Sequence, residues 1–293
     1  MKAAIVMLCR GYANPNAYER LILRNAHIAE SFGNEYPLII FHEGNIIPEH
    51  QEFIKSLTPT LNITFKDIGN EFKWPENVDK STLVDAQHFG VGYRLMCRFA
   101  CYQIWEHVAE YDYIWRIDED TLIGHLNYDP FKYMEENNMD YLWGRPCYES
   151  HPATNETIPA VAHRLLGERW SEDDYVQDPL WVPYTNLFIA RTALFLRDDV
   201  QKFLKKLTEN PMFLTHRWGD HVVSGIVLKA FSSPEKISHL PDFEYFHGSH
   251  GCISKNGRAI QGILAPEEAK FFDCVPSGQG DSHYIAKEIN NAG

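Results

Sequence analysis

The chain has 293 residues, of which 44% are hydrophobic and 23% are charged, so it can bury a sizeable core as one large α/β domain or two small ones. Its formal net charge of −13 argues against nucleic acid as a partner, because a polyanion is bound by a basic surface. No stretch holds the roughly 18 apolar residues that a membrane-spanning helix needs, and residues 1–9 are too short for a signal peptide, so we expect a soluble chain.

Short apolar runs alternate with a helical pattern in the first quarter of the chain. The sequence predicts strands at residues 3–9, 37–41 and 61–68, and a helix at residues 18–32. This alternation is typical of βαβ units with a mostly parallel sheet. Residues 73–89 are polar and show no clear period, so a long ordered loop is expected there.

Further elements follow along the rest of the chain. Residues 91–109 are the most regular predicted helix, and a strand at 113–117 follows at once. The later predicted elements are a helix at 131–137, strands at 141–143 and 186–190, and helices at 198–207 and 219–231. Residues 147–183 are expected to be irregular, and a loop of that length is usually functional or disordered. A boundary near residue 145 is conceivable, although nothing there resembles a flexible linker.

The cysteines do not suggest a metal site. None of the six has a partner at metal-ligand spacing, so free and mostly buried thiols are expected, with disulfides left open. They are Cys9, Cys97, Cys101, Cys147, Cys252 and Cys274.

Three adjacent carboxylates, Asp118, Glu119 and Asp120, directly follow the predicted strand at 113–117. In an open α/β sheet ligands lie beyond the carboxyl ends of strands, and neighbouring acids there repel one another unless a cation or a hydrogen-bond network holds them. In extended geometry Asp118 and Asp120 point to one side and Glu119 to the other. An Asp-x-Asp unit suits a hard divalent metal that bridges to phosphate oxygens. A plain acidic turn is the alternative, because acids favour turns.

A third metal ligand has to come from another segment. The aromatic stretch 243–251 contains His247 and His250, each followed by glycine, and such histidines are more accessible than core histidines. A metal at a diphosphate acts as a Lewis acid and a template while the leaving phosphate gains charge. Asp118, Asp120 and His247 are therefore the candidate metal ligands, with a structural histidine as the alternative.

Other charged residues have a structural and a functional interpretation. Asp220 ends the sequence Arg-Trp-Gly-Asp at a predicted helix start, where it is either a helix cap or a functional carboxylate. Arg94 and Arg98 lie four residues apart on one helix face, as phosphate contacts or as structural residues. The sequence contains no glycine-rich phosphate loop.

Six segments, taken together and in this order, resemble the yeast-type Golgi α-1,2-mannosyltransferases, glycosyltransferase family 15. They are Trp-Pro-Glu at 74–76, Tyr-Arg-Leu-Met-Cys-Arg-Phe at 93–99, Tyr-Ile-Trp-Arg at 113–116, Asn-Leu-Phe-Ile-Ala at 186–190, Arg-Trp-Gly-Asp at 217–220 and Tyr-Phe-His at 245–247. The resemblance covers roughly residues 1–255.

This resemblance implies a GT-A fold: an α/β fold with a mixed, mostly parallel central sheet flanked by helices and a Rossmann-like nucleotide-binding half. It implies a single catalytic domain over residues 1–293, with 1–125 mainly binding the nucleotide and 126–293 mainly binding the acceptor. The implied donor is GDP-mannose, the implied cofactor is Mn²⁺ (or Mg²⁺), and the implied outcome is transfer to a glycan acceptor with retention of the anomeric configuration.

The resemblance also assigns residues. The family's metal motif Glu-Pro-Asp falls on residues 118–120, and its late metal histidine falls on His247. Asp220 is expected to orient or deprotonate the acceptor hydroxyl, or to bind the donor sugar. Candidate contacts to the nucleotide sugar are Arg10, Arg94, Asp118 and Asn186. Candidates for a sugar platform, with core packing as the alternative, are Trp181, Tyr184 and Trp218.

Two departures from the family pattern bear on the mechanism and the setting. A glutamate proposed as nucleophile in the family's Asn-Phe-Glu-Ile-Ala segment is Phe188 here, which excludes a covalent intermediate through this residue. Family members carry an N-terminal anchor and stalk, so we expect either a trimmed lumenal Golgi-type catalytic domain or a soluble cytoplasmic relative. The alternatives are another nucleotide-sugar donor, such as a UDP-hexose or a xylose donor, and a non-catalytic nucleotide- or glycan-binding relative.

Overall fold

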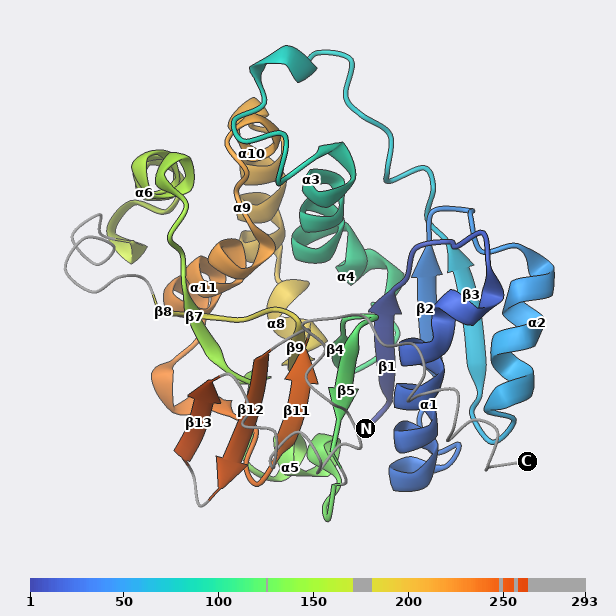
Figure 1. The fold of residues 1–293 in the computed structure, drawn as a ribbon. Helices are drawn as coiled ribbons and strands as arrows, with labels where there is room; N and C mark the ends of the chain where they lie inside the picture. Colours follow the sequence, from blue (N-terminus) through green and yellow to red (C-terminus); the bar gives the residue numbers. More distant parts are fainter. Residues whose placement is uncertain (125, 171–180, 248–249, 256–257, 263–293) are drawn as a thin grey trace. The chain divides into compact units, whose positions relative to one another are not determined.

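The computed structural model describes residues 1–124, 126–170, 181–247, 250–255 and 258–262 (Figure 1). These residues form two compact units that interleave along the chain. Unit 1 contains Met1–Lys2, Gly69–Ile114 and Met134–Ser238. Unit 2 contains Ala3–Ile68, Trp115–Tyr133 and the described residues from His239 onward. The chain passes from one unit to the other inside a single strand, β4 (Tyr113–Ile117). The expected division near residue 125 stays a prediction.

A parallel sheet forms the centre of unit 2. Its strands β1 (Ala3–Leu8), β2 (Leu38–His42) and β3 (Ile63–Asp67) run parallel, with Ile5 opposite Leu38 and Leu38 opposite Ile63. The predicted strands at 3–9, 37–41 and 61–68 are thus confirmed. β1 and β2 are the buried, apolar strands that a parallel sheet requires at its centre.

Two helices connect these strands. α1 (Glu19–Phe32) follows the first strand, and α2 (Pro48–Leu57), which the sequence did not predict, follows the second (Figure 1). α1 ends at Gly33, whose φ of 58° favours glycine. Each helix returns the chain to the start of the sheet, as a parallel connection requires.

Unit 2 also holds an antiparallel sheet that the sequence did not predict. Its strands, in spatial order, are β13 (Arg258–Gly262), β12 (His250–Lys255), β11 (Glu244–His247) and β5 (Thr121–Ile123). β5 and β11 are far apart in the sequence but pair directly, with Thr121 opposite His247. This pairing fixes the distance between the acidic segment and the late histidine.

Unit 1 is mainly helical. The predicted helix at 91–109 is α3 (Val91–Arg98) and α4 (Ile104–His107), joined by a π-helical segment (Phe99–Gln103). The predicted helices at 198–207 and 219–231 are α9 (Asp198–Thr208) and α11 (Asp220–Phe231). Shorter helices are α5 (Pro130–Glu136), which spans the boundary to unit 2, α8 (Thr192–Phe195) and α10 (Pro211–Thr215).

Short strands complete unit 1. β6 (Tyr141–Trp143) pairs antiparallel with β9 (Leu187–Arg191), and β7 (Pro146–Tyr148) pairs antiparallel with β8 (Trp181–Pro183). β10 (Ile237–His239) lies beside β6.

The prediction of an irregular segment at 147–183 is wrong, because α6 (Pro152–Leu166) lies within it. Pro152 occupies the first turn, where its missing N–H costs nothing, and Gly167 ends the helix with a φ of 58°. Pro159 lies inside the helix, in a segment rich in Thr, Asn and Glu. The helix was not predicted because an interior proline usually indicates a break. β8 and all but the first residue of β7 lie in the same segment.

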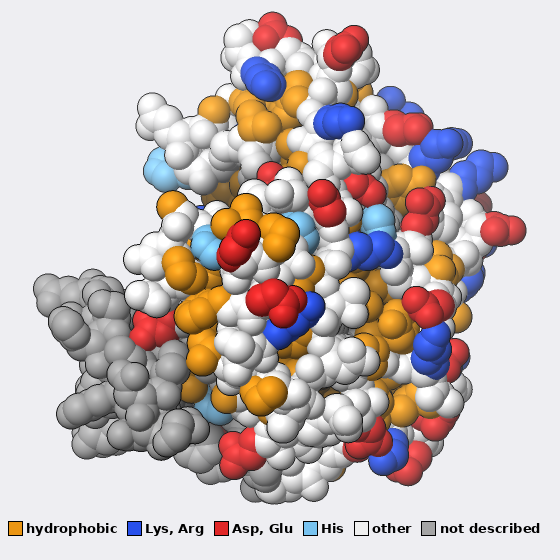
Figure 2. All heavy atoms as spheres, turned by 90° about the vertical axis from the view of Figure 1, so that its right-hand side faces the viewer, with side chains coloured by type: hydrophobic (Ala, Val, Ile, Leu, Met, Phe, Trp, Pro, Cys, Tyr) orange, Lys and Arg blue, Asp and Glu red, His pale blue; other side chains and the backbone are white. Residues whose placement is uncertain are grey.

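Figure 2 shows basic and acidic side chains interspersed over the face that it draws. Four cysteines, Cys9, Cys97, Cys101 and Cys147, are free thiols, and Cys252 and Cys274 lie outside the residues whose side chains are described. Within the described ranges, no helix has both the length and the apolar character that crossing a bilayer requires.

Candidate functional site

The acidic segment lies in the short turn between β4 and β5. Residues 115–117 at the end of β4 are buried, and the Thr121 amide donates to the Asp118 carbonyl at 3.1 Å, which closes the turn. The side chains of Asp118, Glu119 and Asp120 are 33%, 17% and 44% exposed, so all three carboxylates reach the surface of unit 2. The turn at the end of a buried strand therefore places three acids at one point on the surface of unit 2.

The late histidine lies against two of these acids. Because β11 pairs with β5, His247 Nε2 lies 3.1 Å from Asp120 Oδ1 and 3.9 Å from Asp118 Oδ2. Burial alone would raise the pKa of Asp120, but the hydrogen bond and the charge of His247 outweigh it and lower that pKa. The structure thus brings Asp118, Asp120 and His247 together. The side chain of His250 lies outside those described.

Glu119 turns to a different set of partners. It accepts from Arg10 Nε at 2.8 Å, from the Arg10 backbone N–H at 3.1 Å and from the Tyr12 hydroxyl at 3.0 Å. The hydrogen bond that Arg10 donates to Glu119 is the main cause of a raised pKa at Arg10, whose side chain is 69% exposed. Arg10 therefore lies beside the acidic segment with a guanidinium that is still accessible to a ligand.

A buried arginine that the sequence analysis missed supports the same turn. Arg24 of α1 is fully buried; it donates to the Asp118 backbone carbonyl and, at 2.7 Å, to Met7 Sδ, while its Nε has no hydrogen-bond partner among the described residues. Burial lowers its pKa to about 10, although the charges of the acidic segment oppose this shift, so it stays protonated at neutral pH.

A buried cation with an unsatisfied donor is costly unless nearby charge offsets it. The helical spacing offered a signal for Arg24, because it lies three residues after Leu21 and four before Ile28 on the buried face of α1. Arg116 adds a second cation, with Nη2 3.0 Å from Asp118 Oδ1.

The donor set fits a hard divalent metal in its chemistry, since carboxylate oxygens and an imidazole nitrogen suit Mn²⁺ and Mg²⁺. Within the described part of the chain, however, no three His, Cys, Asp or Glu side chains are arranged around one point as metal ligands. His247 instead lies within ion-pair distance of both Asp118 and Asp120. The structure therefore places the carboxylate and imidazole groups that could bind such a metal next to one another.

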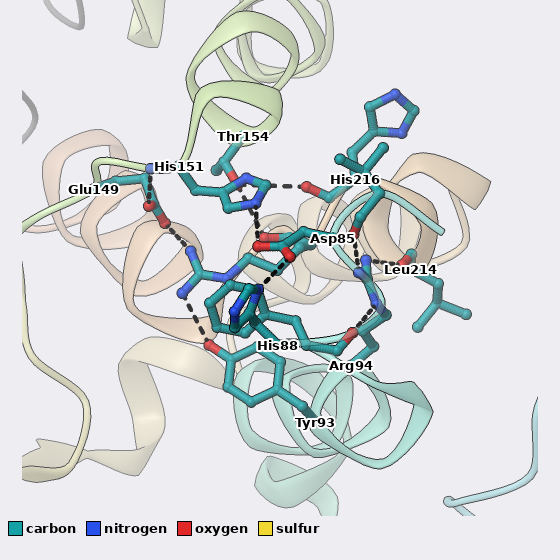
Figure 3. A network of polar contacts seen from close by, with 12 residues as sticks. Asp85, His88, Tyr93, Arg94, Glu149, His151, Thr154, Leu214 and His216 are labelled. Carbon is teal, nitrogen blue, oxygen red and sulfur yellow. Dashed lines mark hydrogen bonds and ion pairs between the residues drawn. The ribbon is translucent and has the colours of Figure 1, made fainter. Parts of the chain in front are cut away.

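The other candidate residues belong to unit 1, and two of them, Arg94 and Trp218, make structural contacts there. Arg94 is buried and donates to the backbone carbonyls of Phe89 at 2.7 Å, Leu214 at 2.5 Å and Val84 (Figure 3). These contacts favour the structural alternative over a nucleotide contact, because a guanidinium engaged in this way is not directed to a phosphate. Trp218 is likewise 1% exposed and donates to Thr157, which favours core packing over a sugar platform.

Asp220 is buried in the first turn of α11. The N-cap position of this helix is Gly219, so Asp220 is its first helical residue, and the Asp220 carboxylate accepts a weak hydrogen bond from Cys97 Sγ at 3.8 Å. Burial raises the pKa of Cys97 to about 12, so this residue stays a thiol that donates to Asp220. The capping alternative for Asp220 is therefore not the one observed.

The segment at 186–190 forms the buried strand β9. Asn186 is 3% exposed and Phe188 is 2% exposed, and the ring of Phe188 stacks on Tyr141 with centroids 4.9 Å apart. Tyr184 stacks with the guanidinium of Arg145 at 4.5 Å. The side chain of Trp181 lies outside those described.

A buried ionic cluster around Glu149 also escaped the sequence analysis. Its carboxylate lies 2.6 Å from Arg217 Nη1 and 2.9 Å from His221 Nε2, and its side chain is 4% exposed. Burial alone would raise the pKa of Glu149, but His221 and Arg217 outweigh that and lower it. No local sequence pattern indicated a role for Glu149, because it precedes α6 in the segment that was predicted to be irregular.

The sequence matches a family profile described as glycolipid 2-alpha-mannosyltransferase over residues 2–257. A curated relative, glycolipid 2-alpha-mannosyltransferase 1 of Candida albicans, is 29% identical over 282 residues, which cover 84% of this chain and 62% of the relative. Glycolipid 2-alpha-mannosyltransferase 2 of the same organism is 30% identical, with 84% and 58% covered. The chain thus spans less than two thirds of the length of these relatives.

Two solved structures share the fold. The mannosyltransferase Ktr4p of Saccharomyces cerevisiae superposes with a TM-score of 0.71 at 22% identity, covering 99% of this chain and 81% of that one. Core-mannan synthase A of Aspergillus fumigatus, in its Mn/GDP form, superposes with a TM-score of 0.71 at 17% identity, covering 97% and 82%. The predicted α/β, GT-A-type fold is confirmed by these matches.

Proposed function

The chain belongs to the glycolipid 2-alpha-mannosyltransferase family, and from this premise we propose that it transfers mannose from GDP-mannose to a hydroxyl of a glycan acceptor with retention of configuration. The observation that carries the proposal is the meeting of Asp118, Asp120 and His247 at the end of β4. Loops beyond strand ends are where α/β folds bind nucleotides.

In this proposal Asp120 and His247 hold a Mn²⁺ (or Mg²⁺) ion, and Asp118 contacts the metal or the ribose. The bound metal would supply positive charge for the diphosphate that departs. The lowered pKa of Asp120 supports this role, because a metal ligand has to be ionised. Arg24 and Arg116 hold the acidic turn in place from within unit 2.

Arg10 is proposed to contact the nucleotide end of the donor. Its side chain is 69% exposed although Glu119 fixes its Nε, so the N–H groups that no described residue accepts can meet phosphate oxygens. Asn186 stays a proposed donor contact in unit 1. Arg94 is not proposed for this role, because its guanidinium donates to three backbone carbonyls.

Transfer is proposed to occur on a single face of the donor sugar. The bond between the anomeric carbon and the phosphate oxygen breaks, the acceptor oxygen bonds to the same face of that carbon, and its proton passes to the departing phosphate. Phe188 supports this route, because its buried ring occupies the position where a nucleophilic glutamate was proposed in the family. Asp220 is proposed to orient the acceptor hydroxyl or to help deprotonate it.

The test measures nucleoside diphosphate release from GDP-mannose, UDP-glucose, UDP-galactose and UDP-xylose with Mn²⁺. We expect release from GDP-mannose alone, lost with a chelator and in Asp120→Asn but kept in Asp129→Asn. Asp129 is a matched control, since it lies in unit 2 and pairs with Tyr36 and Lys132. Release from a UDP-sugar instead would contradict the donor assignment. A chain that GDP stabilises against heat, but that releases nothing from any donor, would be a non-catalytic binding relative.

A further inference from the structure

The carboxylate of Glu119 holds the side chain of Arg10 at two points. Its Oε2 accepts the Arg10 backbone N–H at 3.1 Å, and its Oε1 accepts Arg10 Nε at 2.8 Å. The aliphatic part of Arg10 lies between these two contacts, so its rotamers are restricted. A single exposed ion pair would be a weak constraint, because two long side chains lose entropy when they form it. Glu119 instead fixes both ends of one side chain.

The carboxylate of Glu119 is itself held in place. The Tyr12 hydroxyl donates to the same Oε1 at 3.0 Å. Tyr12 is fixed in turn by Tyr18, which is 1% exposed: its hydroxyl accepts the Tyr12 backbone N–H at 3.0 Å, and the two rings meet edge to face with centroids 5.1 Å apart. The buried Arg24 donates to the backbone carbonyl of Asp118, the residue before Glu119. Glu119 therefore joins two anchored segments, the loop after β1 and the turn after β4.

The loop after β1 also packs closely on the loop after β2. Gly11 lies between Arg10 and Tyr12, and a Cβ there would lie 2.1 Å from the backbone oxygen of Asn45. A glycine is required for so close an approach of two backbones. The backbone that carries Arg10 is thus held by Asn45 as well as by Glu119, and all of these residues belong to unit 2.

We propose that Glu119 is a positioning residue that orients the guanidinium of Arg10 for the diphosphate of the donor. The inference rests on the proposed function, in which Arg10 contacts the nucleotide end of the donor. Ordering one long side chain on binding costs about two- to tenfold in affinity, and an arginine that Glu119 has already ordered avoids this cost.

The negative charge of Glu119 acts in the opposite direction, because a carboxylate near a diphosphate repels it. Removing the carboxylate would therefore lower the Kd for GDP if repulsion were its main effect. The same change raises the Kd if the carboxylate orients Arg10. The sign of the change in Kd separates the two effects.

A double-mutant cycle with Glu119→Ala and Arg10→Ala tests the coupling, with the Kd for GDP measured by isothermal titration calorimetry. We expect Glu119→Ala to raise this Kd by about fivefold in the wild-type background. In the Arg10→Ala background the same change should raise it by less than about 1.5-fold, because the side chain that Glu119 orients is gone.

Each other result of the cycle contradicts a different part of the account. Equal increases in the two backgrounds, or a lower Kd in Glu119→Ala, would overturn the inference alone. An unchanged Kd in Arg10→Ala would overturn the nucleotide role of Arg10 and the inference with it. A wild-type chain that does not bind GDP would overturn the proposed function as well.

Damage to the acidic turn is the rival explanation, because Glu119 lies between the candidate metal ligands Asp118 and Asp120. The cycle is therefore measured both with Mn²⁺ and with a chelator. We expect the same relative increase in Kd under both conditions, since Arg10 acts on the nucleotide itself. An increase that occurs only with Mn²⁺ would show that the variant disturbs the metal ligands, and it would overturn the proposal.

Asp129→Ala is the matched control, because Asp129 is 15% exposed against 17% for Glu119 and has partners of the same kinds. It accepts from the Tyr36 hydroxyl at 2.6 Å and from the Phe131 backbone N–H at 2.9 Å, and it lies 3.2 Å from Lys132 Nζ. This variant should lower Tm as Glu119→Ala does and leave the Kd for GDP unchanged; an equal rise in Kd would overturn the proposal. If Glu119→Ala does not fold, Glu119→Gln replaces it in the cycle and should raise Kd only in the background that keeps the arginine.

Discussion

Replacing Phe188 with glutamate restores the carboxylate proposed as a nucleophile in the family, and we expect it to damage the fold without creating a nucleophile. Phe188 is 2% exposed and stacks on Tyr141, so a side chain at this position is surrounded by the core of unit 1. Phe188→Leu is the matched apolar control. It should lower the free energy of unfolding by about 1–2 kcal/mol through lost ring contacts.

The glutamate adds the cost of a buried charge. If burial raises its pKa by about 3 above the unfolded value, the charged form costs about 4 kcal/mol more than in the leucine variant. Because the pKa of this glutamate is higher in the folded state, the unfolded chain loses the proton first as the pH rises. The free energy of unfolding therefore falls as the pH rises above about 4.3, and it is lowest above the folded pKa. The excess loss should therefore be small at pH 4.5 and about 4 kcal/mol at pH 7.5.

Chemical denaturation at both pH values measures these differences, and mass spectrometry of the enzyme after incubation with donor detects a glycosyl adduct. We expect the pH-dependent loss and no adduct in either the wild-type chain or Phe188→Glu. A Phe188→Glu variant that is as stable as Phe188→Leu at pH 7.5 and that accumulates a mannosyl adduct would refute the reasoning, because the position would then face the donor.

Three further outcomes follow from contacts within unit 1. Arg94→Leu leaves three backbone carbonyls without their donor, so we expect the free energy of unfolding to fall by about 3 kcal/mol. The Kd for GDP should stay the same, and a tenfold higher Kd would show that Arg94 contacts the nucleotide. Gly219→Ala should lower the free energy of unfolding by about 1–3 kcal/mol, because the new methyl group displaces His221 from Glu149. Full stability of this variant would show that the ring is not held there. Cys97, with a pKa of about 12, should resist thiol reagents at pH 7.5 until the protein unfolds, and rapid labelling of the folded chain would contradict its burial.

The regular elements could be predicted because their signals are local. The strand at 113–117 has the predicted bounds, since a mainly apolar and aromatic run of that length is typical of a buried strand. The helix at 91–109 was predicted in place, but its π-helical segment was not. α6 was missed because the interior Pro159 indicates a break, whereas the first-turn proline and the terminal glycine that bound the helix are common in loops as well.

The candidate site could be predicted only as far as residue types in a motif allow. The acids and His247 stand out in sequence, but their contact depends on the pairing of β5 with β11, which joins segments more than 100 residues apart. Arg24 was hidden on an otherwise apolar helix face, and Glu149 owes its partners to tertiary packing. Sequence patterns indicate which groups are available, and long-range pairing decides which of them meet.

The central claim is that Asp118, Asp120 and His247 form the metal site of a nucleotide-sugar enzyme, and direct binding of Mn²⁺ tests it. Electron paramagnetic resonance measures free Mn²⁺ as it is titrated into the chain with GDP present. We expect one bound ion in the wild-type chain and in Asp129→Asn, with binding at least about tenfold weaker in Asp120→Asn and in His247→Ala. Wild-type Mn²⁺ affinity in both of these site variants would contradict the account.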